Sequence, residues 1–207
     1  MRNPLGNKMS ETIGYRTDKF EKQGVCCYET TINPNYGKGK ILQFNLEGIS
    51  LLIFDIILKR KVEFNFNYKK NTILATYLVN GDFLMRTEEL DEENIYNPFY
   101  QYVQVANNHQ NDIHFFENQV VYGVQIVFGK NYIKKYNPQF LYEHSNAIFK
   151  NRLNNNILNT ILSFDSIIDK KLCFHLFIES TCVGLFSMLI ESFKFTRKKE
   201  NNSSYIK

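Results

Sequence analysis

The sequence predicts an α+β protein that is mostly β: an antiparallel β-barrel or jelly roll followed by a small C-terminal helical layer. Two observations lead to this prediction. Short strand-like runs come first, with turn signals roughly every 8–12 residues and no helical segments between them, as in antiparallel sandwiches and barrels. A single long apolar run with helical spacing then follows at 170–195.

Each strand is predicted from alternation of apolar and polar residues and from the turn residues that bound it. Alternation indicates a strand buried on one face. The run at 49–58 is apolar on both faces, which predicts a strand covered on both sides. Asn80-Gly81 predicts a hairpin between the runs 72–79 and 83–87. In chain order, the predicted strands are 25–32, 42–46, 49–58, 62–66, 72–79, 83–87, 100–106, 113–116 and 120–128.

After residue 130 the apolar residues recur at helical spacing. A short turn is predicted at 131–136 and a helix at 154–163. The run at 170–195 is apolar around most of its circumference, so it must be buried on more than one side. We expect one face to pack within the chain and the other to meet a second copy. The expected dimerisation seam consists of Leu172, Leu176, Glu179, Val183, Phe186, Ile190 and Phe193.

These patterns divide the chain into four parts. Residues 1–22 are polar and poorly periodic, and they predict a mobile N-terminal arm. Residues 23–130 form the predicted barrel, and residues 131–195 form a helical dimerisation region. Residues 196–207 are expected to be a polar tail or the remnant of a linker.

The bulk properties exclude several classes of protein. The 207 residues are 43% hydrophobic, which excludes disorder throughout. The net charge of +4 is mild, and short basic clusters such as Lys59-Arg60-Lys61 are too small for a nucleic-acid footprint. The N-terminus lacks an apolar signal core, and no unbroken apolar run is long enough to span a bilayer. The four cysteines show no metal-binding pattern, so we expect a cytoplasmic protein with reduced cysteines and no membrane partner.

The sequence predicts neither a metal site nor an enzyme. A metal site of the barrel type needs about three imidazoles and a carboxylate that converge on one ion. His109, His114, His144 and His175 are too dispersed for this. No phosphate-binding loop, nucleophile elbow or His-Glu-x-x-His motif is present. We therefore expect no metal, no other cofactor and no catalytic residues.

A pocket inside the barrel remains the candidate functional site. The inward face of a small barrel can enclose a small molecule that a few polar groups orient. Arg86 could grip a carboxylate or phosphate if it points inward, although an arginine near a hairpin end is more often solvated. The expected walls of the pocket are Tyr77, Tyr100, Tyr102 and Tyr122.

Residues from about 40 to 195 resemble the N-terminal cupin-like sensor domain of AraC-type transcriptional regulators, in the variety common in Bacteroidetes. Three stretches carry the resemblance: the segment 39–55 with Gly48-Ile49 at its turn, the segment 107–136, and the segment 176–191. The middle stretch contains Asn107-Asn108-His109-Gln110-Asn111, and the last begins with Leu176-Phe177-Ile178-Glu179-Ser180 and is similar to the helix through which those sensors associate.

The resemblance implies an effector-sensing and dimerisation module: a homodimer that binds a small-molecule effector such as a sugar or a carboxylate. Regulators of this family end in a DNA-binding domain of two helix-turn-helix units, which is absent from this chain. DNA contact is therefore expected only through such a further domain, and this chain alone should show no sequence-specific DNA affinity. The main alternative is a stand-alone cupin-like binding or scaffold protein with no DNA role. A third is a metal-free cupin isomerase.

Overall fold

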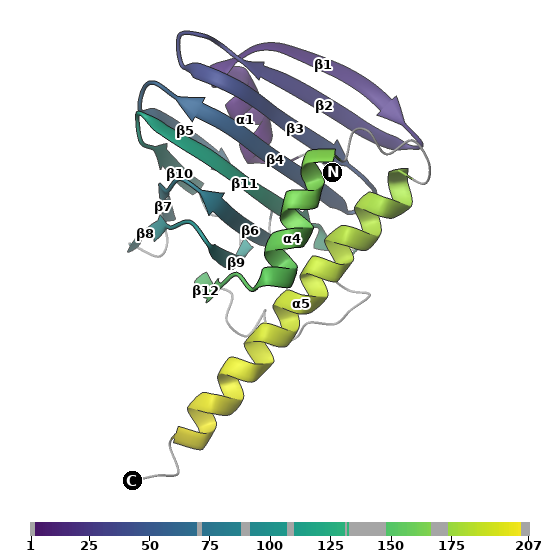
Figure 1. Cartoon of the computed structure of the whole chain (residues 1–207), viewed down its shortest axis with the longest axis vertical. Helices are drawn as coiled ribbons and strands as arrows, with labels where there is room; N and C mark the ends of the chain where they lie inside the picture. The colour runs from purple at the N-terminus through teal and green to yellow at the C-terminus, as the bar shows by residue number, and fades with distance from the viewer. Residues whose placement is uncertain are drawn as a thin grey trace. The chain divides into compact units, whose positions relative to one another are not determined.

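The computed structural model describes residues 3–69, 72–87, 92–106, 110–130, 132, 148–166 and 174–203. The chain divides into two compact units, residues 1–153 and residues 154–207. The first unit contains an N-terminal helix and the strands, and the second contains the C-terminal helices (Figure 1).

The described strands of the first unit form two antiparallel sheets. The larger has the order β1-β2-β3-β4-β11-β6-β9-β12, and the smaller has the order β5-β10-β7-β8. Their bounds are β1 (Gly14–Lys22), β2 (Val25–Ile32), β3 (Gly37–Asn45), β4 (Ile49–Leu58), β5 (Val62–Asn67), β6 (Thr72–Asn80), β7 (Phe83–Thr87), β8 (Glu92–Tyr96), β9 (Tyr100–Ala106), β10 (Gln110–Phe115), β11 (Gln119–Phe128) and β12 (Ile148–Arg152).

The predicted fold class is confirmed: a jelly-roll arrangement of antiparallel strands precedes a helical C-terminal part. The chain passes repeatedly from one sheet to the other, as in double-sheet jelly rolls. The two sheets face each other and do not close into one continuous barrel, because β1, β12, β5 and β8 remain edge strands of the described sheets.

The hairpin predicted at Asn80-Gly81 is wrong. Strand β6 pairs with β11 and β9 in the larger sheet, whereas β7 pairs with β10 and β8 in the smaller one. The turn therefore carries the chain between sheets. Gly81 has φ +75°, and a Cβ there would lie 2.6 Å from the backbone oxygen of Val120. The turn chemistry was recognised correctly, but a turn does not specify which strands pair.

The N-terminal residues differ from the predicted mobile arm. Helix α1 (Pro4–Ile13) is followed directly by β1, which pairs with β2 along its length. Asn3 is the N-cap and Pro4 occupies the first turn, where proline is favoured. Leu5, Met9 and Ile13 lie four residues apart on one face of the helix, and all three are buried.

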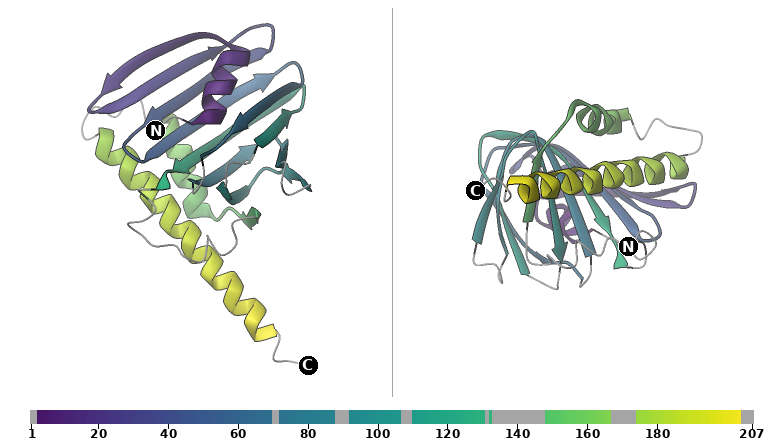
Figure 2. Two further views of the ribbon diagram at one scale, coloured as in Figure 1. Left: turned by 180° about the vertical axis from the view of Figure 1, so that it is seen from behind. Right: turned by 90° about the horizontal axis from the view of Figure 1, so that it is seen from below.

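The hydrophobic core of the first unit lies between the two sheets, and α1 contributes to it (Figure 2). Phe54, Phe64 and Phe83 surround Phe115 at centroid distances of 5.0–6.3 Å. Edge-to-face and tilted ring pairs of this kind add to the stabilisation from burial. Strand β4 is buried on both faces, as its sequence predicts.

The second unit contains α4 (Asn155–Leu162), the 3₁₀ turn η1 (Ser163–Ser166) and α5 (Phe174–Ser203). Asn154 caps α4, because its Oδ1 accepts a hydrogen bond from the backbone N–H of Ile157 at 2.9 Å. Helix α5 extends through residues that were expected to form a polar tail. The turn predicted at 131–136 lies outside the described residues except for Tyr132. The boundary between the units falls after Leu153, because β12 pairs with β9.

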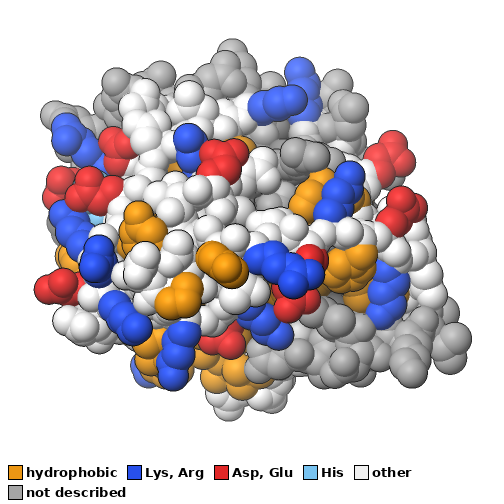
Figure 3. Space-filling view, turned by 90° about the horizontal axis from the view of Figure 1, so that it is seen from above, with side chains coloured by type: hydrophobic (Ala, Val, Ile, Leu, Met, Phe, Trp, Pro, Cys, Tyr) orange, Lys and Arg blue, Asp and Glu red, His pale blue; other side chains and the backbone are white. Residues whose placement is uncertain are grey.

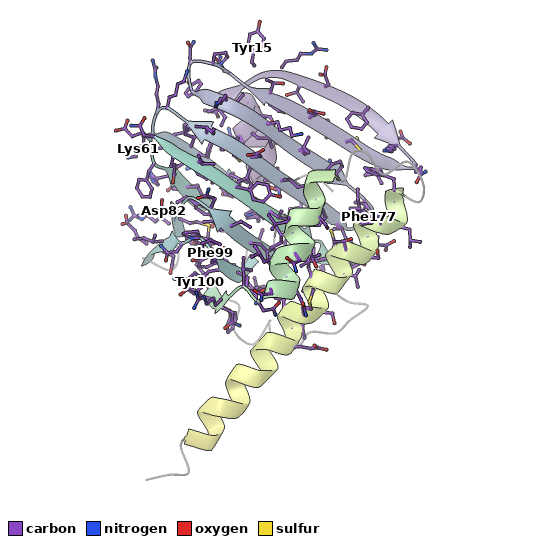
Figure 4. All side chains as sticks on the ribbon, viewed as in Figure 1. Tyr15, Lys61, Asp82, Phe99, Tyr100 and Phe177 are labelled. Atoms are coloured by element: carbon purple, nitrogen blue, oxygen red, sulfur yellow. The ribbon has the colours of Figure 1, made fainter. Side chains whose placement is uncertain are left out.

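Charged side chains on the surface are mixed in sign. Lys and Arg side chains are interspersed with Asp and Glu over the face drawn in Figure 3. Exposed ion pairs, such as Lys61 with Glu63 at 2.8 Å, contribute little to stability. Tyr15, on edge strand β1, is 74% exposed and points away from the sheet (Figure 4).

Candidate ligand-binding site

A row of polar side chains crosses the inner face of the larger sheet. The strand register aligns Gln43 with Leu52, Leu52 with Gln125, Gln125 with Thr76, and Thr76 with Tyr102. Side chains at aligned positions project from the same face of a sheet. Polar residues therefore interrupt an otherwise apolar face at one level, next to the core.

Gln125 is the centre of a buried hydrogen-bond network. Its Oε1 accepts hydrogen bonds from Tyr68 Oη at 2.7 Å and from Asn3 Nδ2 at 3.0 Å. Its Nε2 donates to Thr76 Oγ1 at 3.2 Å. Gln125 is 4% exposed, and a buried amide is tolerated only when its polar atoms are bonded in this way.

Gln104 begins a second buried chain of hydrogen bonds. Its Nε2 donates to Thr87 Oγ1 at 3.3 Å, and Thr87 Oγ1 donates to Asn111 Oδ1 at 3.0 Å. Gln104 Oε1 has no hydrogen-bond partner among the described residues, although the side chain is 4% exposed. A buried acceptor without a donor costs free energy, so this atom is a place where a ligand or a water molecule would bind favourably.

Aromatic rings form the wall beside these amides. Tyr96 stacks on Tyr102 at a centroid distance of 4.0 Å and on Phe83 at 4.7 Å. Tyr102 Oη accepts a hydrogen bond from the backbone N–H of Asn97 at 2.6 Å. Burial raises the pKa of Tyr68, Tyr96 and Tyr102 above the usual value, so these hydroxyls remain neutral.

A small cavity of about 10 Å³ lies where the two networks and the aromatic wall meet, which is room for about one water molecule. Its lining contains amides, hydroxyls, a thioether and apolar groups, and no charged side chain among the described residues. The lining residues are Tyr68, Leu74, Thr76, Met85, Tyr96, Tyr102, Gln104 and Gln125.

The structure brings only part of the predicted pocket to this cavity. Tyr102 lines it, and Tyr100 is half-buried against the core, with Lys150 Nζ 4.4 Å from its ring. Figure 4 shows Tyr100 beside Phe99 at the start of β9.

The other predicted pocket residues do not line the cavity. Tyr77 and Tyr122 project from the opposite face of the larger sheet, because their neighbours Thr76 and Val121 point inward. Arg86 is exposed, because alternation along β7 turns Met85 inward.

Sequence patterns did not reveal Gln104, Gln125, Thr76, Tyr68 or Tyr96 as site residues. Alternation assigns polar positions to the solvent face, so an inward glutamine is read as exposed. The available signals were Gln104 in the apolar run 100–106 and Gln125 in the apolar run 119–128, since a polar residue within a doubly covered strand must be buried and bonded.

No group of three His, Cys, Asp or Glu side chains among the described residues could hold a metal ion. His114 lies on β10 with its Nδ1 3.1 Å from Glu63, and His175 lies on α5 with its Nε2 3.7 Å from Glu179. His109 and His144 lie outside the described residues. The described cysteines, Cys26, Cys27 and Cys182, are free thiols.

The predicted dimerisation seam lies on α5. Leu176 is 62% exposed, whereas Phe186 is buried within the chain at 4%. Glu179, Val183 and Ile190 are half-buried. Leu172 and the side chain of Phe193 lie outside the described part of the structure. The carboxylate of Glu179 lies 3.7 Å from Nε2 of His175, one helical turn before it. This pairing is consistent with a position of Glu179 at the solvent-exposed edge of the seam.

Among the described residues, one helix has the length and composition of a membrane span. The window Phe174–Glu191 of α5 has a mean hydropathy of 1.4, and 33% of it is buried. The sequence contains no unbroken apolar run long enough to span a bilayer. This window is apolar only on average, because polar residues interrupt it. Core helices of soluble proteins can have the same length and composition, so these two properties do not assign α5 to a membrane.

No known protein-family profile and no curated protein sequence matches the chain. Solved structures do. The AraC-like transcriptional activator CuxR aligns with 90% of this chain and 63% of its own length, at a TM-score of 0.50 and 7% identity. Apo ToxT K231A from Vibrio cholerae aligns with 72% of this chain and 58% of its own length, at a TM-score of 0.50 and 13% identity.

Two further solved structures are similar to the chain at lower TM-scores. ToxT bound to (E)-4-(8-methylnaphthalen-1-yl)but-3-enoic acid covers 70% of this chain and 57% of its own length, at a TM-score of 0.45 and 10% identity. An RmlC-like cupin with a double-stranded β-helix fold from Methanocaldococcus jannaschii covers 59% of this chain and 97% of its own length, at a TM-score of 0.35 and 14% identity.

The chain thus spans 57% to 63% of the length of these activators. Identities this low establish the fold alone. The fold implied by the sequence resemblance is confirmed to this extent: the chain shares its fold with solved structures of AraC-like activators.

Proposed function

We propose that this chain is the effector-sensing and dimerisation module of an AraC-type transcriptional regulator. The observation that carries the proposal is the polar cavity between the sheets, in a fold shared with AraC-like activators. Gln104 Oε1 is a buried acceptor that offers a hydrogen bond to a ligand.

In this proposal the chain is a sensor and not an enzyme. The described lining of the cavity offers amide and hydroxyl groups for recognition, but no carboxylate, imidazole or thiol that could transfer a proton or attack a substrate. DNA contact belongs to a further domain, and the sensor acts on it by shifting the position of its helices. A cytoplasmic location follows from this role.

The experiment joins the chain to the DNA-binding domain of an AraC-like activator and measures transcription of a reporter gene. We expect transcription to exceed that from the DNA-binding domain alone and to change with growth conditions. Gln104→Leu should remove the response to conditions while the protein level is unchanged. Transcription equal to that of the isolated DNA-binding domain in every condition would leave the stand-alone cupin-like binding protein as the better description.

A further inference from the structure

Asn3 is buried, although asparagine is usually found on the protein surface. It precedes α1, is 0% exposed, and reaches Gln125, which is 122 residues away in sequence. Its carboxamide is used twice: Oδ1 accepts a hydrogen bond from the backbone N–H of Gly6 at 3.3 Å, and Nδ2 donates to Gln125 Oε1 at 3.0 Å. The first contact caps the helix, and the second joins the helix to the wall of the cavity.

The first turn of α1 lies directly on the polar row of the larger sheet. A Cβ at Gly6 would be 2.7 Å from Gln43 Oε1 and 2.7 Å from Leu52 Cδ1. The row runs from Gln43 through Leu52 and Gln125 to Thr76 and Tyr102. Helix α1 therefore covers one end of the row, and the cavity lies over the other end.

Gln125 links the end of the row that α1 covers to the end where the cavity lies. Its side chain lines the cavity, and the same Oε1 that faces the interior receives the Asn3 amide. A ligand larger than one water molecule needs more room than the cavity offers. The Asn3 carboxamide is not a lining group, but it contacts Gln125 Oε1, so its displacement would leave room beside that wall of the cavity.

Helix capping alone does not account for Asn3. An N-cap requires only a side-chain acceptor, which serine supplies as well as asparagine does. The Nδ2 contact needs a carboxamide of this length, and it buries a second polar group that must be paired. The arrangement has the chemistry of a bound amide ligand that is tethered to the chain.

We propose that the Asn3 carboxamide is a built-in occupant of the interior site. The effector is then an uncharged molecule whose amide or hydroxyl group replaces Asn3 at Gln125 Oε1 and also donates to Gln104 Oε1. Binding releases the first turn of α1. This inference rests on the proposed function, since both place the ligand between the sheets.

The lining determines the class of ligand. No Lys, Arg, His, Asp or Glu side chain lines the described cavity, and an unpaired charge is costly to bury. Of the two expected effectors, a sugar fits these groups and a carboxylate does not.

The first test compares Asn3→Ser with the wild type by amide hydrogen exchange in α1. Serine keeps the cap but is too short to reach Gln125. Amide exchange across Leu5–Ile13 should therefore accelerate by about tenfold, which corresponds to the loss of one buried hydrogen bond. Gln125→Met, which removes the same acceptor at similar volume, should accelerate exchange at least as much, because it also removes the hydrogen bonds to Tyr68 and Thr76. Asn7→Ser is the matched control within the helix and should change little. Protection in Asn3→Ser equal to wild type would show that Asn3 is only a cap and would overturn the proposal.

The second test uses acetamide, which has the chemistry of the missing side chain, and acetate as its charged counterpart. In Asn3→Ser, acetamide should give saturable NMR shifts of the Gln125 and Gln104 side-chain amides. The wild type, in which Asn3 occupies the site, should respond at least about tenfold more weakly. Acetate should give no such shifts. Equal responses to the two probes, or no response in the variant, would overturn the ligand class. Neither failure touches the reporter measurement, which tests the sensor role without reference to Asn3.

Discussion

At the residue scale, Gly6 determines how closely the first turn of α1 approaches the larger sheet. Alanine would normally be the better helix former by about 1 kcal/mol. Here its Cβ would press on Gln43 and Leu52, which are 3% and 0% exposed and cannot move aside freely. We expect Gly6→Ala to lower the free energy of unfolding by about 1–2 kcal/mol, as in overpacked cores.

Denaturant unfolding measures this change. Gly184→Ala on α5 is the matched control, because a Cβ there would meet no described atom within 4 Å. It should stabilise by about 0.5–1 kcal/mol. A Gly6→Ala variant as stable as the control would mean that α1 does not lie as close to the sheet as the structure places it.

Buried hydroxyl and thiol groups predict a loss of stability at alkaline pH. Burial raises the pKa of Cys27 from 9.0 to about 11 and holds the pKa of Tyr68 and Tyr96 above the usual 10.0. Because these pKa values are raised in the folded state, the stabilisation is complete below pH 9 and is lost as the pH rises, when the unfolded chain releases protons that the folded chain retains.

The unfolding free energy should therefore be constant from pH 7 to 9 and then fall, by up to about 1.4 kcal/mol per pH unit for each such group. Denaturant titrations at several pH values measure it. Tyr96→Phe keeps the ring stack and removes the ionisable hydroxyl, so its stability should fall less steeply above pH 10. A parallel decline in the two proteins would show that Tyr96 does not carry this effect.

At the scale of elements, α1 is a core helix that was not predicted from its sequence. Its apolar residues are only Leu5, Met9 and Ile13, one per turn, within a polar segment. The four-residue spacing is visible in the sequence, but three apolar residues are a weak periodic signal. The capping residue Asn3 and the following Pro4 were the stronger clue to a helix start.

Met9 tests whether α1 is part of the folded unit. Its side chain is 0% exposed in the core between the sheets. Met9→Ala should cost about 2–4 kcal/mol, the usual range for truncating a buried methionine. Lys8→Ala, one position away on the exposed side, should cost less than about 0.5 kcal/mol. Equal stability of the two variants would restore the mobile arm that the composition suggested.

Strand positions followed well from the sequence, and strand partners did not. The runs 49–58 and 100–106 coincide with β4 and β9, because turn residues bound them clearly. No strand was predicted where the edge strand β8 lies, because its polar residues, which are tolerated at a sheet edge, do not alternate clearly with apolar ones. Asn80-Gly81 was predicted to form a hairpin because it is a favoured hairpin turn. The prediction failed because local turn chemistry carries no information on which distant strands pair.

The candidate site shows the same limit. Tyr102, which lines the cavity, was predicted as a pocket wall because aromatic residues on strands commonly line pockets. Gln104 and Gln125 were missed because their inward direction follows from the register of four strands, which no local pattern encodes.

At the scale of the whole molecule, both helices of the second unit carry an exposed leucine. Leu176 on α5 is 62% exposed, and Leu162 on α4 is 43% exposed. An exposed leucine alone is ordinary, but Leu176 belongs to the seam at heptad-like spacing that predicts association with a second copy.

Leu176→Asp should therefore convert a dimer into a monomer at micromolar concentration, with little change in the unfolding transition of the monomer, because a charge within an apolar interface is costly to bury. Analytical ultracentrifugation measures the change. Leu162→Asp places the same charge on an exposed leucine outside the seam and should leave the dimer intact. Phe186→Asp is less informative, since Phe186 is buried within its own chain and its loss would unfold the helix packing first. A wild-type chain that sediments as a monomer at high micromolar concentration would show that α5 is not a dimerisation helix. The sensor would then have to act on its DNA-binding partner within a single chain.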